Sequence, residues 1–102
     1  ISDYIKSVTI KEGITKIGNY SFYSFDYLEN ITILGNITII GDSAFANCRS
    51  LSSINLPNSV SEIQSYAFFH CESMLFFSIA SDSKLRIMES FAFSESFSKF
   101  CI

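Results

Sequence analysis

Leu51-Ser-Ser-Ile54-Asn-Leu56 is one copy of an apolar pattern that recurs along the chain at a constant spacing. The other copies occupy residues 5–10, 28–33, 74–79 and 97–102, so that successive copies begin at positions 5, 28, 51, 74 and 97, each 23 residues after the last. A constant period of this length is typical of solenoids, in which each unit buries its apolar side only against its neighbours. The sequence therefore predicts a stack of similar coils.

One unit, residues 51–73, shows the elements that we expect in every coil. Residues 54–56 alternate with the two-residue period of a β-strand, and the Pro-Asn-Ser sequence at 57–59 ends the strand with a turn. A second extended piece follows at 60–63. The segment 65–71 fits about one turn of helix, because it places small side chains four residues apart on one face.

The units stack as one solenoid segment that we expect to span residues 1–102. The chain opens at the tail of one unit and stops after the first strand of another, which predicts that it is an excerpt of a longer array. In the fourth unit the Ala92-Phe93 pair comes two residues late, which predicts a local distortion and not a domain boundary. The expected units are 5–27, 28–50, 51–73, 74–96 and a partial unit at 97–102.

Equivalent residues of adjacent coils should touch, because parallel strands lie about 4.8 Å apart. Gly18 and Gly41 follow the second extended piece of their units, where a tight bend tolerates a positive φ. The core is expected to consist of columns of like side chains. Three of these columns are Ile5, Leu28, Leu51 and Met74; Val8, Ile31, Ile54 and Phe77; and Phe22, Phe45, Phe68 and Phe93.

The pattern Leu-x-x-Ile-x-Leu-Pro-x-Ser-Val-x-x-Ile-x-x-x-Ala-Phe-x-x-Cys, which runs from Leu51 to Cys71, resembles the BspA-type leucine-rich repeat, also called the Treponema pallidum type. The resemblance covers essentially the whole chain. It implies an α/β repeat solenoid dominated by β-structure, wound as a right-handed superhelix with a parallel sheet on the concave face and short helical or 3₁₀ turns. Family members are commonly surface proteins of bacteria and parasitic protists, linked to adhesion to host matrix or to other cells.

Composition and charge narrow the classes of function. With 48% hydrophobic and 17% charged residues the chain is too apolar to be disordered, yet no apolar run approaches the roughly 18 residues of a membrane span. The formal net charge is −3, and the 7 Lys and Arg residues form no basic stripe. We therefore expect no nucleic-acid partner and no membrane span in this segment.

The outward positions of the long strands are the candidate binding face. Their side chains are mostly hydroxyls and amides, which suit hydrogen bonding to a glycan or an extended peptide; they equally favour strands and keep a sheet soluble. The residues are Ser7, Asn30, Ser53 and Phe76; Thr9, Thr32, Asn55 and Ser78; and Lys11 and Leu34. Phe76 stands out as a hydrophobic anchor of the kind that dominates interfaces.

Residue types that carry catalysis or bind metals are sparse. Cys48 and Cys71 share an offset, which favours a buried pair of thiols and leaves a disulfide as the alternative. His70 is the only histidine, and with these cysteines it does not make the four-ligand spacing of a zinc site. We therefore expect no enzyme activity, no metal and no cofactor.

Two functions are open from the sequence. The first is a binding module on the cell surface or in a secreted protein, with a protein or glycan ligand. The second is an intracellular scaffold that binds proteins, since unpaired buried thiols also suit the cytoplasm. In both cases the nearest partners are the neighbouring repeats. Three sequons, at Asn19, Asn30 and Asn36, leave glycosylation open, and a glycan on Asn30 would obstruct the expected binding face.

Overall fold

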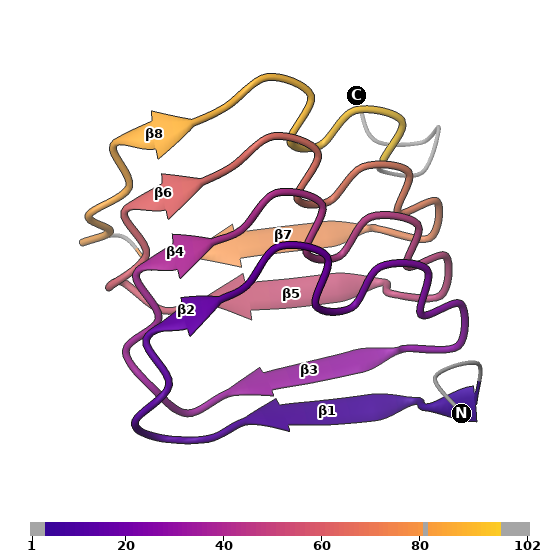
Figure 1. The fold of residues 1–102 in the computed structure, drawn as a ribbon, viewed down its shortest axis with the longest axis horizontal. Coiled ribbons are helices and arrows are strands. Elements are labelled where there is room, and N and C mark those ends of the chain that lie inside the picture. Colours follow the sequence, from indigo (N-terminus) through magenta and orange to yellow (C-terminus); the bar gives the residue numbers. More distant parts are fainter. Residues whose placement is uncertain (1–3, 81, 97–102) are drawn as a thin grey trace.

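The computed structural model describes residues 4–80 and 82–96, in which the chain winds through a series of coils, each with one long and one short strand (Figure 1). Residues 97–102, the expected partial unit, lie outside the described residues. The long strands are β1 (Ser7–Ile10), β3 (Asn30–Ile33), β5 (Ser53–Leu56) and β7 (Phe76–Ile79). The short strands are β2 (Lys16–Ile17), β4 (Ile39–Ile40), β6 (Glu62–Ile63) and β8 (Ile87–Met88).

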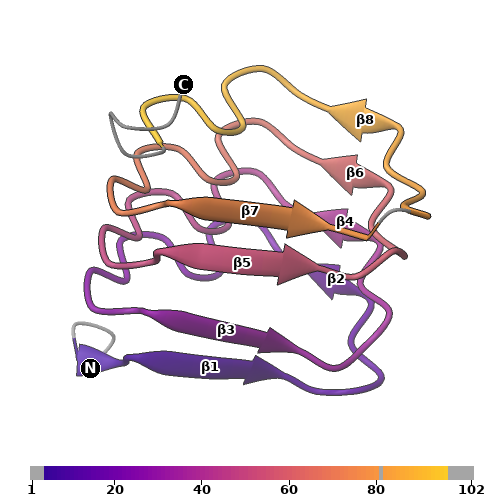
Figure 2. The ribbon, with the colours of Figure 1, turned by 180° about the vertical axis from the view of Figure 1, so that it is seen from behind.

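All strand pairs are parallel, and their register follows the repeat. Ser7 pairs with Asn30, and Ser53 pairs with Phe76, each 23 positions further along the chain. The long strands occupy one side of the stack and the short strands the other, and the path between them is right-handed (Figures 1 and 2). The repeat solenoid expected from the 23-residue period is confirmed.

The long strands form two sheets, where the sequence predicted one. β1 pairs with β3 and β5 pairs with β7, but β3 and β5 form no ladder, whereas the short strands make one continuous sheet in the order β2-β4-β6-β8. Pro57 contributes to this break. The N–H of Leu34 donates to the carbonyl of Ile10 at 2.9 Å to close the β1–β3 pair. Pro57 holds the equivalent position after β5 and has no N–H to donate to β3.

The predicted columns form the core between the two sides of the stack. Phe45 and Phe68 are fully buried, and their rings stack with centroids 5.2 Å apart and an interplanar angle of 6°. Phe22 and Phe93 extend this stack at 5.2 and 4.9 Å, and both are half-buried because they lie in the first and last described coils. Leu28, Leu51 and Met74 are fully buried in a second column.

The one turn of helix expected at 65–71 is absent, and a run of tight turns takes its place. The N–H groups of Ala67 and Phe69 donate to carbonyls three residues earlier, at 3.2 and 3.0 Å. Those of Phe68 and His70 donate instead to the following coil, at 2.7 and 2.9 Å. A helix would use every N–H within its own segment. Here every second N–H bonds to a neighbouring coil, so that stacking replaces the helix.

These turns require a positive φ at two positions in each coil. Tyr66, for example, has φ 60° and is the third residue of the turn closed by Ala67, as in a type II turn. All eight of these residues are non-glycine, although the left-handed conformation costs roughly 1–2 kcal/mol for each such residue. The hydrogen bonds between coils offset that cost. The eight residues are Tyr20, Ser43, Tyr66 and Phe91, and Ser24, Asn47, His70 and Glu95.

Gly18 and Gly41 do not have the positive φ that we expected for them; Gly13 alone among the glycines has one, at 93°. Gly41 is required for a different reason, which is close approach of the preceding coil. A Cβ atom at Gly41 would lie 2.8 Å from the backbone N of Asn19 and 2.8 Å from the carbonyl O of Ile17.

We therefore expect Gly41→Ala to lower the free energy of unfolding by about 1–3 kcal/mol, because backbone atoms must shift to admit the methyl group. Gly18→Ala is the matched control one coil earlier. Its Cβ would meet only the Ser21 hydroxyl, at 3.3 Å, and that side chain can rotate. Urea titration of both variants measures the difference. Equal losses would show that Gly41 is not specially constrained.

The predicted distortion of the fourth unit is present between its two strands. β7 keeps the 23-residue register with β5. In the short sheet, however, Glu62 pairs with Ile87 and Ile63 with Met88, two residues beyond that register. The extra residues are accommodated in the bend between β7 and β8, so the core columns continue and Phe93 still stacks on Phe68.

Candidate binding face and its depression

The candidate residues lie on the outer face of the long strands or, for Lys11 and Leu34, directly after them. All of them are exposed except Ser53, which is half-buried. Phe76 has the largest exposed fraction among the apolar ones, 68%, followed by Leu34 with 55%. The candidates are Ser7, Thr9 and Lys11; Asn30, Thr32 and Leu34; Ser53 and Asn55; and Phe76 and Ser78.

The structure gathers these residues into two groups. Ser7 and Thr9 on β1 lie beside Asn30 and Thr32 on β3. A second group joins β5 and β7, where Ser53 pairs with Phe76. The two groups meet along the line where β3 and β5 lie in contact without a ladder. The face is therefore two small polar sheets with a seam between them.

An open depression of about 630 Å³ lies at the seam, where the chain enters β3, β5 and β7. Of the residues predicted for the face, only Asn30 lines it. The lining is polar apart from one leucine side chain. It consists of Glu29, Asn30, Ser50, Ser52, Glu72, Ser73 and Leu75.

The position of these residues follows from the buried leucine column. Leu28, Leu51 and Met74 each point into the core just before a long strand and are held by turns that bond to the carbonyl three residues earlier. Because side chains alternate along extended backbone, the residues on either side of each anchor point outward. Ser50 is further fixed because its hydroxyl donates to the carbonyl of Asp26 at 2.6 Å.

Two carboxylates give the depression a negative character. Oε2 of Glu72 lies 3.5 Å from Nε of Arg49 and 3.5 Å from Nε2 of His70. These side chains are substantially exposed, so the contacts add little stability. For Glu29 no ion pair is recorded within residues 4–80 and 82–96.

Sequence reasoning missed most of this lining because it considered only the strands and the residues that follow them, not the residues that precede them. A usable signal was present one step earlier in each unit. Serine occupies the position before the apolar anchor at Ser50 and Ser73, and the position after it holds Glu29, Ser52 and Leu75. The hydroxyls, amide and carboxylates can form several hydrogen bonds to a ligand with many hydroxyl groups.

The two cysteines belong to the core and not to the site. Both are fully buried and free, and the disulfide alternative is not formed. Their thiols donate to main-chain carbonyls of the previous coil, Cys48 to Phe22 at 3.1 Å and Cys71 to Phe45 at 3.2 Å. Burial raises the pKa of Cys71 to about 12 and raises the pKa of Cys48 still further, with a contribution from Cys71. Such thiols are inert near neutral pH.

Metal sites and membrane-spanning helices are absent from the part of the chain that the structure describes. In the ranges 4–80 and 82–96, no group of three or more His, Cys, Asp or Glu side chains is arranged to hold a metal ion. In the same ranges the structure has no helix with the length and apolar character needed to cross a bilayer.

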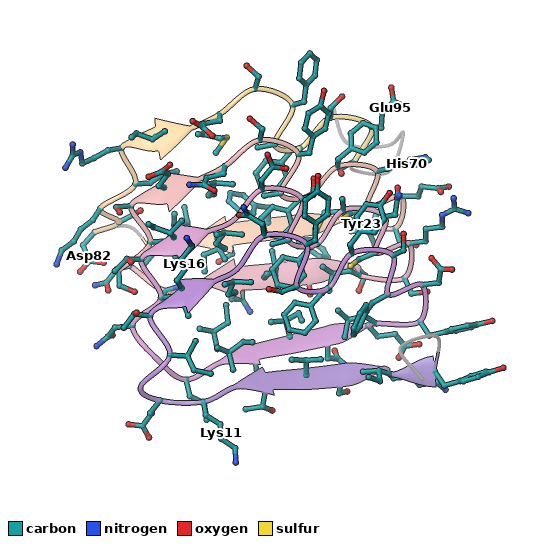
Figure 3. All side chains as sticks on the ribbon, viewed as in Figure 1. Lys11, Lys16, Tyr23, His70, Asp82 and Glu95 are labelled. Atoms are coloured by element: carbon teal, nitrogen blue, oxygen red, sulfur yellow. The ribbon has the colours of Figure 1, made fainter. Side chains whose placement is uncertain are left out.

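The turns form a separate, more aromatic side of the stack. Figure 3 shows Tyr23, His70 and Glu95 there, away from Lys11 and Lys16. Tyr66 stacks on Phe91 with ring centroids 5.4 Å apart, so that each ring covers part of the apolar surface of the other. This side presents stacked rings, whereas the depression at the seam gathers polar side chains from three coils, which makes the depression the better candidate for binding a polar ligand.

Comparison with known proteins is consistent with this geometry. A leucine-rich repeat protein from Bacteroides ovatus ATCC 8483 is 31% identical with a TM-score of 0.80, over 91% of this chain and 23% of that chain. The pneumococcal vaccine antigen PcpA is 28% identical with a TM-score of 0.83, over 89% of this chain and 22% of that chain. A leucine-rich cell surface protein from Faecalibacterium prausnitzii A2-165 shares the fold at 21% identity and a TM-score of 0.60, over 83% of this chain and 32% of that chain.

The chain therefore spans about a quarter to a third of the length of these structural relatives. No curated protein matches it. The family profile described as the BspA type leucine rich repeat region matches residues 2–100. Together with the 23-residue register and the stacked phenylalanine column, this match shows that the chain belongs to the BspA-type leucine-rich repeat family.

Proposed function

We propose that the chain is a non-enzymatic binding module of a cell-surface or secreted protein. It contacts glycans, matrix proteins or other cells through the outer face of its long strands. The observation that carries the proposal is this face itself. It combines exposed hydroxyl and amide side chains, one exposed Phe76 and an open depression on the same side of the stack. Such a surface suits recognition by hydrogen bonds around a small apolar anchor.

The relatives support a location outside the cell. One of them is a pneumococcal vaccine antigen, and a vaccine antigen has to be reached by antibodies. The structural similarity between that antigen and the present chain is the reason for extending this location to the present chain. Labelling of intact cells with a membrane-impermeant biotin reagent tests it directly. A protein that is labelled only after lysis would contradict surface display.

The character of the face supports binding without catalysis. On its described strands the outward side chains include no histidine, cysteine or carboxylate, which are the usual groups for proton transfer and nucleophilic attack. The carboxylates of the depression lie before the strands, next to serines. The thiols are buried under the coils and do not reach this surface.

Binding of the intact protein to arrays of glycans and matrix proteins tests the role of the face. We expect Thr32→Lys and Phe76→Ala to weaken binding of any detected ligand by about tenfold or more, because they add a charge or remove the anchor. Thr15→Lys is the matched control, since Thr15 is exposed just before β2 on the side of the short strands. Unchanged binding in the first two variants, or an equal loss in all three, would exclude the face.

A further inference from the structure

We propose that the depression at the start of β3, β5 and β7 is a subsite for one neutral hexose unit of a glycan. The proposal rests on the binding function above and makes it specific. It assigns a site to residues before the strands, most of which are not part of the predicted face. Its volume of about 630 Å³ lies within the roughly 300–1,000 Å³ typical of small-ligand sites.

The first argument is the match between the lining and a ring that carries several hydroxyl groups. Glu29 and Glu72 are acceptors that form strong charge-assisted bonds to hydroxyl donors. The hydroxyls of Ser52 and Ser73 can donate or accept as the ligand requires, whereas the Ser50 hydroxyl, whose proton goes to the carbonyl of Asp26, can only accept. A sugar presents hydroxyl groups, each both a donor and an acceptor, on most of its ring carbons, and the lining can bond to both functions.

The second argument is pre-organisation. Ser50 is tied to the carbonyl of Asp26, and the Glu72 carboxylate lies 3.5 Å from side-chain nitrogens of Arg49 and His70. The backbone entering β7 is fixed because the N–H groups of Leu75 and Phe76 both bond to the carbonyl of Ser52, at 2.8 and 3.2 Å. A ligand that binds such a surface loses less free energy to ordering side chains.

The third argument concerns the apolar part of the lining. Leu75 is 48% exposed in the depression, and the neighbouring Phe76 is 68% exposed. Hexoses have one face of C–H groups, which can cover this apolar surface while the hydroxyls bond to the polar rim. A peptide that is anchored by large apolar side chains would find only Leu75 to contact in this lining.

The charge of the lining determines which sugars fit. The depression contains two carboxylates, and the nearby Arg49 is already paired with Glu72. Sulfated or sialylated units would place like charges together, which costs free energy in a partly desolvated site. Neutral hexoses avoid this repulsion.

The depression also joins the two sheets of the face. Glu29 and Asn30 lie at the start of β3, whereas the rest of its lining lies before β5 and β7. A bound sugar would therefore bridge the seam between β3 and β5. We expect amide hydrogen exchange of β3 and β5 to slow when the ligand binds.

The test is a titration of the intact ¹⁵N-labelled protein with methyl glucoside, methyl galactoside, N-acetylglucosamine and lactose, and with a heparin-derived disaccharide as the anionic probe. At least one neutral sugar should shift the amide signals of Glu29, Ser52 and Leu75 in a saturable way, and the heparin fragment should not. Ser52→Leu should weaken this binding about tenfold or more by filling the depression.

The matched control is Lys6→Leu, which changes the equivalent residue two coils away from Ser52, outside the depression. Leucine already occupies this repeat position at Leu75, so neither substitution should disturb the fold. Glu72→Gln provides a second variant with unchanged shape, and it should weaken binding several-fold because a neutral amide replaces the charged acceptor.

Four outcomes would overturn the proposal. They are the absence of shifts with every neutral sugar, equal binding of the heparin fragment, binding that Ser52→Leu and Glu72→Gln leave unchanged, and a ligand that is a peptide. If array binding remains sensitive to Thr32→Lys but not to Ser52→Leu, the subsite is wrong and the proposed function stands. If sugars shift the depression while no array ligand responds to Thr32→Lys, the subsite stands and the wider face is wrong.

Discussion

Phe68→Ala is expected to lower the free energy of unfolding by about 3–5 kcal/mol. Phe68 is fully buried and lies between the rings of Phe45 and Phe93, with centroid distances of 5.2 and 4.9 Å. It also meets Phe77 edge to face at 6.5 Å. Removing its ring leaves a cavity at the centre of the stack and interrupts the only aromatic column that runs through all described coils. Since each coil is stabilised only by its neighbours, the array should unfold cooperatively at lower denaturant.

Phe76→Ala is the matched control, because it makes the same substitution at a phenylalanine that is 68% exposed. It should change stability by less than about 0.5 kcal/mol. Urea titration of both variants compares them. A loss below about 1 kcal/mol for Phe68→Ala, or equal losses for both, would show that the column does not hold the coils together.

Raising the pH from 9 to 11 is expected to destabilise the reduced protein by several kcal/mol, through Cys48 and Cys71. In the unfolded chain both thiols lose their protons near the ordinary pKa of 9.0. In the folded protein burial raises the pKa of Cys71 to about 12 and raises that of Cys48 as well. The cause is the cost of placing a thiolate in an apolar core.

The sign of this change in the free energy of unfolding follows from the number of protons bound by the folded and unfolded states. Between pH 9 and pH 12 the folded state keeps thiol protons that the unfolded state has lost. The free energy of unfolding therefore falls as the pH rises, by about 1.4 kcal/mol per pH unit for each thiol. The stabilisation is complete below pH 9 and is progressively lost above it. From pH 9 to 11 the two thiols together account for roughly 4–5 kcal/mol.

The control is the double variant Cys48→Ser, Cys71→Ser. A serine hydroxyl can donate to the carbonyls of Phe22 and Phe45, as the thiols do, but it stays neutral at these pH values. The two proteins differ only at these two residues, so the difference between their urea titrations at pH 9, 10 and 11 isolates the thiols. Parallel pH dependences would show that the thiols are accessible to water.

Most of the fold could be predicted from the sequence because a fixed period constrains neighbours directly. Once coils of 23 residues stack, Phe45 must meet Phe68 and Cys48 must meet Cys71, whatever the details of the turns. The two late residues of the fourth unit were visible for the same reason, and the shift in register at Ile87 follows from them.

The turns were predicted less well. The short segment 65–71 has helix-like spacing, but its N–H groups have partners in the next coil that a single unit does not reveal. The role of Gly41 was mistaken in the same way. Its constraint comes from the backbone of Asn19 and Ile17, which is close only after stacking.

The candidate site was likewise predicted only in part. The outward residues of the strands were predictable from alternation alone, and they are exposed as expected. The depression could not be predicted from the sequence, because it depends on the seam between β3 and β5. It also depends on three coils that bring Glu29, Ser52 and Glu72 to one place.

The sequence by itself determined the stack, its register and its buried columns, because a constant repeat length makes equivalent side chains neighbours. Only the tertiary structure decided where that stack is interrupted, how its turns are bonded and where its surface is hollow. The physical reason is that these features depend on backbone hydrogen bonds and close contacts between coils, and one unit contains only half of each.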